Sequence, residues 1–351
     1  MQKRSILAIL ATSAVLSACG QIRTRDTAAP DAVKPIYITA PTQYDTDDPA
    51  IWVNPQDASQ SLIVGTDKNS DGALYVFNLQ GKIVQKVGGL KRPNNVDIAY
   101  GLPLNGHPTD YAVTTERETN KLRFYRLPDM QPIDNGGLEV FNGETHRGPM
   151  GIAVYTRPAD HAQFAIVSRK SGPGEGYLWE YALKDDGHGA ITGTLVRKFG
   201  KYSGKKEIES IGVDNELGYV YYSDEQTGIR KYYADPAKGN QELALFGQGQ
   251  FGEDNEGISI YKTGPTTGYI LVSDQGLNNF NVYAREGAPG APHTHALLKQ
   301  FPVSAIHSDG SDVVNVPMGK DFPQGLFVVM STDKTFHLYD WRDILKRIQA
   351  K

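Results

Sequence analysis

The chain has 351 residues, of which 39% are hydrophobic and 22% are charged, so it carries enough apolar material for a sizeable folded core. Its 36 Lys and Arg residues against 40 Asp and Glu residues give a formal net charge of −4, and no long basic run occurs, which argues against nucleic acid as a partner. No apolar stretch of about twenty residues follows the N-terminal region, so the rest of the chain is not expected to span a membrane.

The N-terminus has the features of an export signal. Residues 1–18 begin with two basic side chains, continue with an apolar segment and end just before Cys19, the single cysteine. The run Leu-Ser-Ala-Cys resembles a bacterial lipobox, in which the cysteine becomes the lipidated first residue, although an ordinary signal with a chance cysteine is the alternative. Because Gly20 rather than an aspartate follows, we expect an outer-membrane lipoprotein that faces the periplasm or the cell surface and touches the membrane only through this anchor.

The rest of the chain divides into a short linker and one long repetitive region. Residues 19–41 are polar and rich in Ala, Pro and Thr, which is typical of a tether. Residues 42–351 carry short alternating apolar runs separated by Gly, Asn, Asp and Pro, a pattern that predicts strands and turns. Helical periodicity is found only at residues 341–348, where we expect an amphipathic helix.

The alternating runs repeat along this region. Six segments begin with a small or acidic residue followed by apolar alternation, and we align them on Ile51, Ile98, Ile152, Ile211, Ile258 and Val314. The segments lie roughly 50 residues apart, and each is followed by a second strand and by a third strand rich in aromatic residues. Units of this size are typical of propeller blades, so the sequence predicts an all-β fold, a six-bladed β-propeller. A large β-sandwich would not explain the sixfold self-similarity.

Charged and polar residues recur at equivalent positions of the repeats. The second strand of each unit ends in three polar residues, whose third members are Lys68, Arg117, Lys170, Glu225, Gln275 and Asp333. Two positions before the aligned apolar residue, the last three units carry Glu209, Glu256 and Asp312. Equivalent positions of a propeller meet at one mouth of its channel, so we expect a basic half from the first three blades and an acidic half from the last three. Solvated strand ends would explain any single one of these charges but not their segregation.

The two halves suggest different ligands. Lys and Arg make charge-assisted hydrogen bonds to phosphate oxygens, so three facing cations suit a phosphorylated substrate. Clustered carboxylates without cysteine or histidine partners suit a hard cation that prefers oxygen ligands, and calcium fits such a site better than zinc.

Four segments carry a specific resemblance. Asp47–Trp52, Asn94–Asp97, Asp254–Gly257 and Phe322–Phe327 resemble the β-propeller phytases, and the similarity extends from about residue 44 to about residue 345. This resemblance implies a six-bladed, calcium-requiring 3-phytase that releases phosphate from phytate, myo-inositol hexakisphosphate.

The resemblance also implies roles for single residues. The phosphate-binding cations of the family fall on Lys68, Arg117 and Lys170. The catalytic acids fall on Glu209, Glu225 and Glu256, and the calcium ligands fall on these three together with Asp48, Asn95, Asp97, Asp254, Gln275, Asp309 and Asp312. Two positions depart from the family pattern: Met150 stands where a tyrosine is expected, and Ser171 where an acid is expected.

The expected reaction is phosphomonoester hydrolysis by a monomeric enzyme, in which calcium neutralises phosphate charge and positions a water for in-line attack. A calcium-dependent six-bladed lactonase or esterase is the enzymatic alternative, and it would have no use for three facing cations. The remaining alternative is a surface-anchored propeller that binds a ligand without turning it over.

Overall fold

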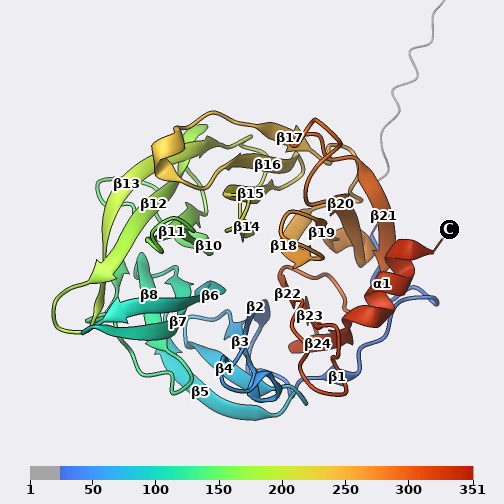
Figure 1. Cartoon of the computed structure of the whole chain (residues 1–351), viewed down its shortest axis with the longest axis horizontal. Helices are drawn as coiled ribbons and strands as arrows, with labels where there is room; N and C mark the ends of the chain where they lie inside the picture. The colour runs from blue at the N-terminus through green and yellow to red at the C-terminus, as the bar shows by residue number, and fades with distance from the viewer. Residues whose placement is uncertain (1–23, 351) are drawn as a thin grey trace, which may run out of the picture.

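A computed structural model describes residues 24–350, so the predicted signal and Cys19 lie outside the described residues. The described chain forms six four-stranded antiparallel sheets arranged around a central axis, and Figure 1 shows them as the blades of a disc. The prediction of an all-β, six-bladed propeller is therefore confirmed.

Within each blade the strands follow one another outward from the axis. The innermost strands are β2 (Thr46–Trp52), β6 (Pro93–Leu104), β10 (Pro149–Thr156), β14 (Ile211–Asp214), β18 (Asn255–Lys262) and β22 (Ser311–Val314). The second strands are β3 (Leu62–Asp67), β7 (His107–Glu116), β11 (Gln163–Arg169), β15 (Tyr219–Asp224), β19 (Gly268–Asp274) and β23 (Leu326–Ser331). The third strands are β4 (Gly72–Asn78), β8 (Lys121–Arg126), β12 (Glu175–Asp185), β16 (Gly228–Tyr233), β20 (Asn279–Ala284) and β24 (Thr335–Asp340). The outer strands are β5 (Ile83–Leu90), β9 (Leu138–Glu139), β13 (Ile191–Lys201), β17 (Ala244–Phe246), β21 (Leu297–Pro302) and β1 (Tyr37–Ile38).

The outer strand of the sixth blade comes from the beginning of the chain. Tyr37 and Ile38 of β1 pair antiparallel with Leu338 and His337 of β24, and this pairing joins the two ends of the ring. Upstream of β1, Val33 is buried and forms a bridge with Val303. The prediction that residues 19–41 form a tether is therefore wrong for this stretch, because its apolar side chains and backbone groups complete the last two blades.

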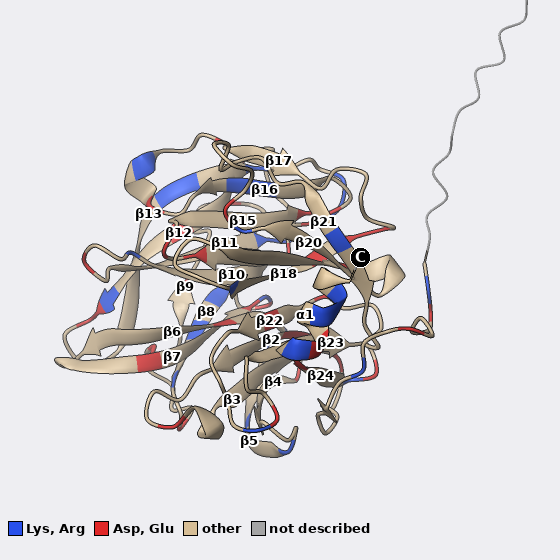
Figure 2. Cartoon of the chain, turned by 45° about the vertical axis from the view of Figure 1, so that its right-hand side comes forward, with Lys and Arg blue, Asp and Glu red and all other residues tan. Residues whose placement is uncertain are grey.

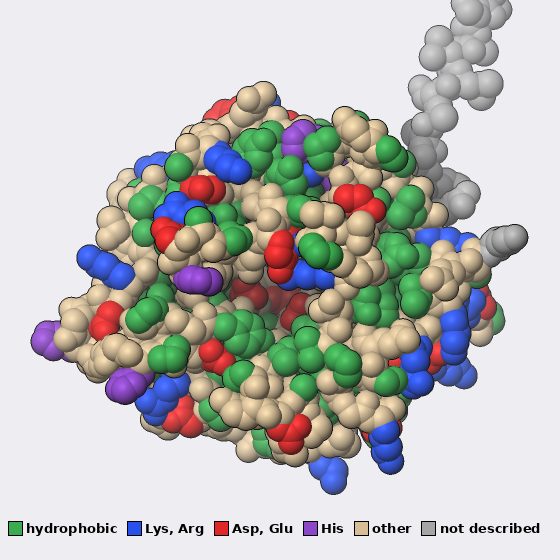
Figure 3. Space-filling view, viewed as in Figure 1, with side chains coloured by type: hydrophobic (Ala, Val, Ile, Leu, Met, Phe, Trp, Pro, Cys, Tyr) green, Lys and Arg blue, Asp and Glu red, His purple; other side chains and the backbone are tan. Residues whose placement is uncertain are grey.

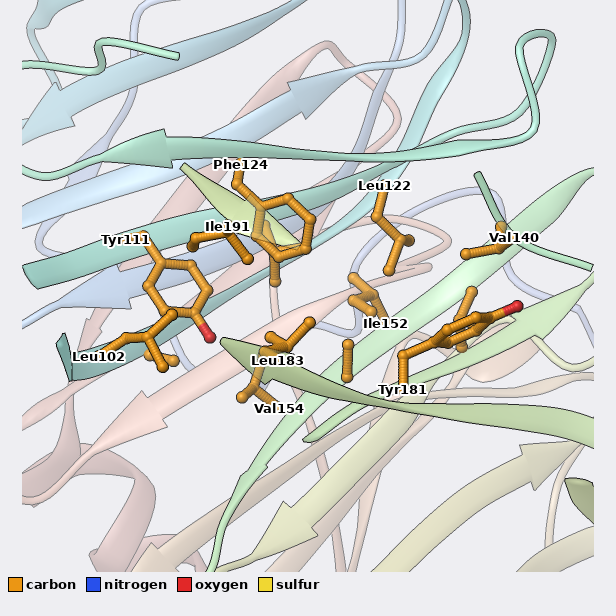
Figure 4. Packing of buried hydrophobic residues seen from close by; sticks show 14 of the residues in the cluster. Leu102, Tyr111, Leu122, Phe124, Val140, Ile152, Val154, Tyr181, Leu183 and Ile191 are labelled. Atoms are coloured by element: carbon orange, nitrogen blue, oxygen red, sulfur yellow. The ribbon is translucent and has the colours of Figure 1, made fainter. Parts of the chain in front are cut away.

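The apolar cores lie between neighbouring blades. In the described chain each adjacent pair of blades encloses one cluster of buried hydrophobic residues, so the ring is held by six such contacts. Figure 4 shows the cluster between the second and third blades, where Tyr111 and Phe124 of one sheet face Ile152, Val154 and Leu183 of the next. Strand side chains alternate between the two faces of a sheet, and every sheet is covered on both faces, which explains the high aromatic and aliphatic content of the strands.

A single α-helix follows β24 in the described chain. Helix α1 (Trp341–Gln349) begins after Asp340, whose side chain accepts a hydrogen bond from the Arg342 amide, and so the predicted amphipathic helix is confirmed. Trp341 is fully buried and stacks on Tyr261 at a centroid distance of 3.6 Å. Figure 2 shows basic residues along the helix, of which Lys346 is highly exposed.

The strand pairings correct the alignment of the repeats. In each of the first five blades, one residue of the inner strand pairs with the residue that immediately precedes the polar triplet. These inner-strand residues are Pro49, Val96, Ile152, Ile211 and Ile258. The alignment on Ile51 and Ile98 is therefore wrong by one full strand period in the first two blades, and Val314 lies further still from the matching position. Apolar alternation has a period of two, so a shift by two residues leaves the hydrophobic pattern equally well matched.

Candidate active site

The ends of the second strands gather at one mouth of the central channel. Lys68, Arg117, Lys170, Glu225 and Gln275 each follow a second strand directly, as the sequence predicted. The sixth blade differs from the others, because the Asp333 side chain is 60% exposed and accepts a hydrogen bond from Thr335 of its own hairpin. Five blades therefore bring their triplets to the mouth.

Two further residues reach the mouth because of β-bulges. In β2 the register shifts between Thr46 and Pro49, and in β6 it shifts between Pro93 and Val96. A bulge breaks the alternation of side chains and re-aims one of them. As a result Asp47 and Asn94, both fully buried, occupy the positions in the first two blades that Glu209 and Glu256 occupy in the fourth and fifth.

The sequence analysis did not select Asp47 and Asn94 as site residues. Both stand inside the segments that carried the family resemblance, immediately before Asp48 and Asn95. The sequence signal that could have identified them is their regular position, two residues before the inner-strand residue that pairs just ahead of the polar triplet of the same blade. The alignment on apolar residues was shifted by two positions in these blades and hid this regularity.

Asn94 connects three blades. Its amide nitrogen donates hydrogen bonds to Asp47, at 2.7 Å, and to Glu209, and its carbonyl oxygen accepts one from Arg117. Burial opposes ionisation of Glu209, but the charges of Lys68 and Arg117 and the Asn94 bond hold the pKa of Glu209 below its ordinary value. Glu209 is therefore kept as a carboxylate beside the cations.

Lys68 lies between two carboxylates from different blades. Its ammonium forms an ion pair with Asp47 and lies 3.7 Å from Asp309, which in turn accepts a hydrogen bond from Gln275. Burial disfavours the charged lysine, yet the negative charge of Asp47 raises the pKa of Lys68 above its usual value. Burial raises the pKa of Asp309 to about 6.

The other two predicted phosphate-binding residues have different surroundings. Arg117 is partly buried and contacts the sulfur of Met150, which stands where a tyrosine was expected. Burial lowers the pKa of Arg117. Lys170 forms an ion pair with Glu207, and its side chain is 52% exposed. The three cations therefore lie on consecutive blades, but each is already paired with a polar group of the mouth.

The carboxylates of the mouth form two clusters that share Glu225. Glu207, Glu209 and Glu225 can bring one oxygen each within 4.8 Å of one another, and so can Glu225, Asp254 and Glu256. Among the described residues, Oε1 of Glu225, one oxygen of Asp254 and one of Glu256 are buried without a polar partner, and Oε2 of Glu225 has only the Lys206 ammonium at 3.2 Å. Such unpartnered buried oxygens are costly in an empty site, and a bound cation satisfies them.

Burial and mutual repulsion change the acidity of these groups. Burial, reinforced by the charge of Glu209, raises the pKa of Glu225 to about 9. Burial and the neighbouring glutamates also raise the pKa of Glu256 well above its ordinary value. Perturbation of this kind concentrates at functional sites.

One cation at the mouth was not predicted. Lys206 lies on the loop between β13 and β14, and its ammonium forms an ion pair with Asp254 and lies 3.2 Å from Glu225. No repeat position predicts it, because the connecting loops do not share the periodicity of the blades.

Three of the predicted calcium ligands lie deeper, in the central channel. Asp48, Asp97 and Asp312 line a cavity between the inner strands, and each accepts a hydrogen bond from a backbone amide of the next blade, at 3.1, 2.7 and 2.8 Å. Figure 3 shows a hollow at the centre of the disc with acidic side chains at its bottom.

The predicted ligand set is therefore divided between two places. Glu209, Glu225, Asp254, Glu256, Gln275 and Asp309 lie at the mouth, whereas Asp48, Asp97 and Asp312 hold neighbouring blades together in the channel. Asn95 also lines the channel cavity, and its side-chain oxygen accepts a hydrogen bond from Asn94 of the mouth at 2.9 Å.

Known proteins resemble this chain in sequence and in fold. The 3-phytase of Bacillus subtilis (strain 168) is 28% identical over 322 residues, which cover 86% of this chain and 81% of the relative. Among solved structures, a Kuenenia stuttgartiensis hydrazine synthase chain matches with a TM-score of 0.50 and 12% identity over 83% of this chain and 82% of that chain, a likeness of fold alone. A structure described as the Dos1 propeller matches with a TM-score of 0.43 and 12% identity, over 86% of this chain and 68% of that chain. A family model described as Phytase matches residues 3–337, and the chain therefore belongs to the phytase family.

Proposed function

We propose that the protein is a calcium-dependent 3-phytase that releases phosphate from phytate at the mouth of the propeller. Membership of the phytase family and the similarity to a 3-phytase support the reaction. The observation that carries the calcium dependence is the shared carboxylate. Glu225 is fully buried and joins two acidic clusters, and among the described residues its oxygens have no polar partner apart from the Lys206 ammonium, 3.2 Å from Oε2.

The chemistry of the donors fits calcium. Both clusters offer carboxylate oxygens. Calcium binds such oxygens with a coordination number of about six to eight and a flexible geometry. We assign one cation to Glu207, Glu209 and Glu225, and a second to Glu225, Asp254 and Glu256. When bound, such ions would neutralise phosphate charge and favour the attack of water on phosphorus.

The cations of the mouth bind the substrate in this proposal. Lys68 and Arg117 stand next to Glu209, so a phosphate held by them lies beside the first acidic cluster. Lys170 is more exposed and can hold a neighbouring phosphate that does not react. Binding of such remote groups orients the reacting one, which lowers the barrier of the chemical step.

Asn94 has a positioning role in the same proposal. Its amide group donates to Asp47 and Glu209 and accepts from Arg117, so it fixes the relative positions of one cation and two acids. Preorganised groups of this kind need no rearrangement as charge develops on the phosphate oxygens.

We further propose that the protein is exported as a monomeric lipoprotein, with Cys19 as its lipid-modified residue and residues 1–18 as the signal. Among residues 24–350 no helix is both long and apolar enough to cross a bilayer. In this proposal the lipid on Cys19 attaches the protein to the outer membrane, where it faces the periplasm or the cell surface.

The decisive experiment measures phosphate release from phytate by the metal-stripped protein, with calcium added and with EGTA. We expect turnover with calcium and none with EGTA, together with a lower melting temperature in EGTA, because an ion that binds only the folded state stabilises it. Release of phosphate at the same rate in EGTA would contradict the proposal. Calcium binding without turnover would instead favour a binding propeller.

A further inference from the structure

Lys206 places a positive charge inside the second acidic cluster. Its ammonium lies 3.2 Å from Glu225 and is ion-paired with Asp254, whose side chains are 0% and 4% exposed. The lysine side chain itself is 37% exposed, so the cation reaches the buried carboxylates from the solvent side. It contacts two of the three carboxylates that were assigned to a calcium ion above.

The backbone around Lys206 is fixed to the strand that carries Glu225. The Ser203 hydroxyl donates to Asp224 at 2.7 Å, the Lys205 ammonium donates to the carbonyl of Gln226 at 2.8 Å, and the Tyr202 hydroxyl donates to the Lys206 carbonyl. The loop is thus held on both sides of Glu225. From this fixed backbone the Lys206 side chain extends to the cluster, and it is 37% exposed.

An ammonium and a divalent ion compete for these two carboxylates. Two positive charges within a few ångströms repel strongly in a partly buried site, and the lone pairs that the ammonium occupies are lost to the ion. Conversely, without any cation the three buried carboxylates of the cluster would repel one another.

We propose that Lys206 is a tethered counter-ion that holds Glu225 and Asp254 in place in the metal-free protein and is displaced when calcium enters. This inference rests on the proposed function, because it concerns the calcium affinity of the same site. As a consequence, Lys206 raises the calcium concentration that the enzyme requires. In the metal-free protein it also reduces the repulsion among the carboxylates of the cluster.

The test compares Lys206→Met with a matched variant, Lys205→Met, in the full chain. Lys205 is the adjacent lysine on the same loop, and its substitution removes the same charge from a carbonyl contact outside the cluster. Calcium binding to each metal-stripped protein is measured by titration calorimetry, and melting temperatures are measured in EGTA and in saturating calcium.

We expect Lys206→Met to bind calcium about tenfold more tightly than the wild type and to melt at a lower temperature in EGTA but not in calcium. Lys205→Met should match the wild type in both measurements. The conservative Lys206→Arg variant keeps the charge and should retain the wild-type affinity, which separates competition from a general effect on folding.

Wild-type calcium affinity in Lys206→Met would overturn the proposal while leaving the proposed function intact. Unchanged calcium affinity with a raised KM for phytate would also overturn it, because Lys206 would then be a phosphate ligand. If neither the wild type nor Lys206→Met binds calcium, both the proposal and the calcium-dependent function fail. Binding by the variant alone would support the proposal.

Discussion

The Lys68 ammonium of the first blade lies 3.7 Å from the Asp309 carboxylate that precedes the inner strand of the sixth blade. This contact joins the sixth blade to the first. The sixth blade is itself completed by the pairing of β1 with β24, so the blade that carries Asp309 depends on the N-terminal strand.

The first prediction concerns the N-terminal segment that completes the last two blades. Val33→Asp should lower the melting temperature and the activity together, because it places a carboxylate among the buried residues that join the fifth and sixth blades. Ile38→Asp is the matched control, since Ile38 is 50% exposed on the neighbouring strand, and it should be tolerated. Thermal denaturation of both variants checks this. Equal melting temperatures of the two variants would mean that the N-terminal segment does not stabilise the last two blades.

The second prediction concerns the cations of the mouth. Lys68→Ala and Arg117→Ala should each reduce kcat/KM for phytate by about tenfold to a hundredfold, the equivalent of one charge-assisted hydrogen bond. Lys170→Ala should cost less, because that side chain is half exposed. Calcium affinity is the internal control and should not fall, since these residues cannot ligate the ion. Normal hydrolysis of phytate by the Lys68 and Arg117 variants would show that the phosphate site lies elsewhere.

The third prediction concerns the acids. Glu209→Gln and Glu256→Gln each remove a charge from one carboxylate cluster, so calcium affinity and turnover should fall together and recover in part at high calcium. Asp333→Asn changes an exposed acid of the sixth blade and should have neither effect. Calorimetry and phytate hydrolysis measured on the same preparations check both statements. A Glu256 variant that binds calcium like the wild type would remove that residue from the ligand set.

The fourth prediction concerns pH and a buried lysine remote from the mouth. Lys231 is fully buried, its ammonium donates to the Pro292 carbonyl and lies 3.1 Å from His295, and burial lowers its pKa to about 8 from the usual 10.5. Between those two values the unfolded chain still holds a proton that the folded chain has released. The contribution of Lys231 to the free energy of unfolding therefore increases as the pH rises through this window.

The measurement is the melting temperature of the wild type minus that of Lys231→Met. This difference should grow as the pH rises from about 7 to about 10, because methionine has no proton to lose. Lys238→Met, an exposed lysine near the same blade, should give a difference that changes little. A pH-independent difference for Lys231→Met would show that the buried ammonium is not destabilised by its surroundings.

The fifth prediction concerns anchoring. Cys19→Ser removes the group that would carry the lipid, so the protein should move from the membrane fraction to a soluble or unprocessed form. Fractionation of cells that express each version checks this. A wild-type protein found in the soluble periplasmic fraction would exclude lipid modification.

The sequence by itself determined the architecture, because that architecture is repeated. Six apolar units separated by turn residues can bury both faces of each sheet only by packing against neighbours, so a closed ring of blades follows from the pattern. The polar triplets at the strand ends, with Lys68, Arg117 and Glu225 among them, were found for the same reason.

Tertiary structure decided which neighbouring residues face the mouth. A period-two pattern cannot reveal a bulge, and the bulges of β2 and β6 bring Asp47 and Asn94 to the mouth, while Asp48 reaches the channel and accepts a hydrogen bond from the next blade. Nor can periodicity place a side chain from a connecting loop. Lys206 belongs to the site only because its loop is fixed across the strand end that carries Glu225, a contact between segments that no local sequence signal encodes.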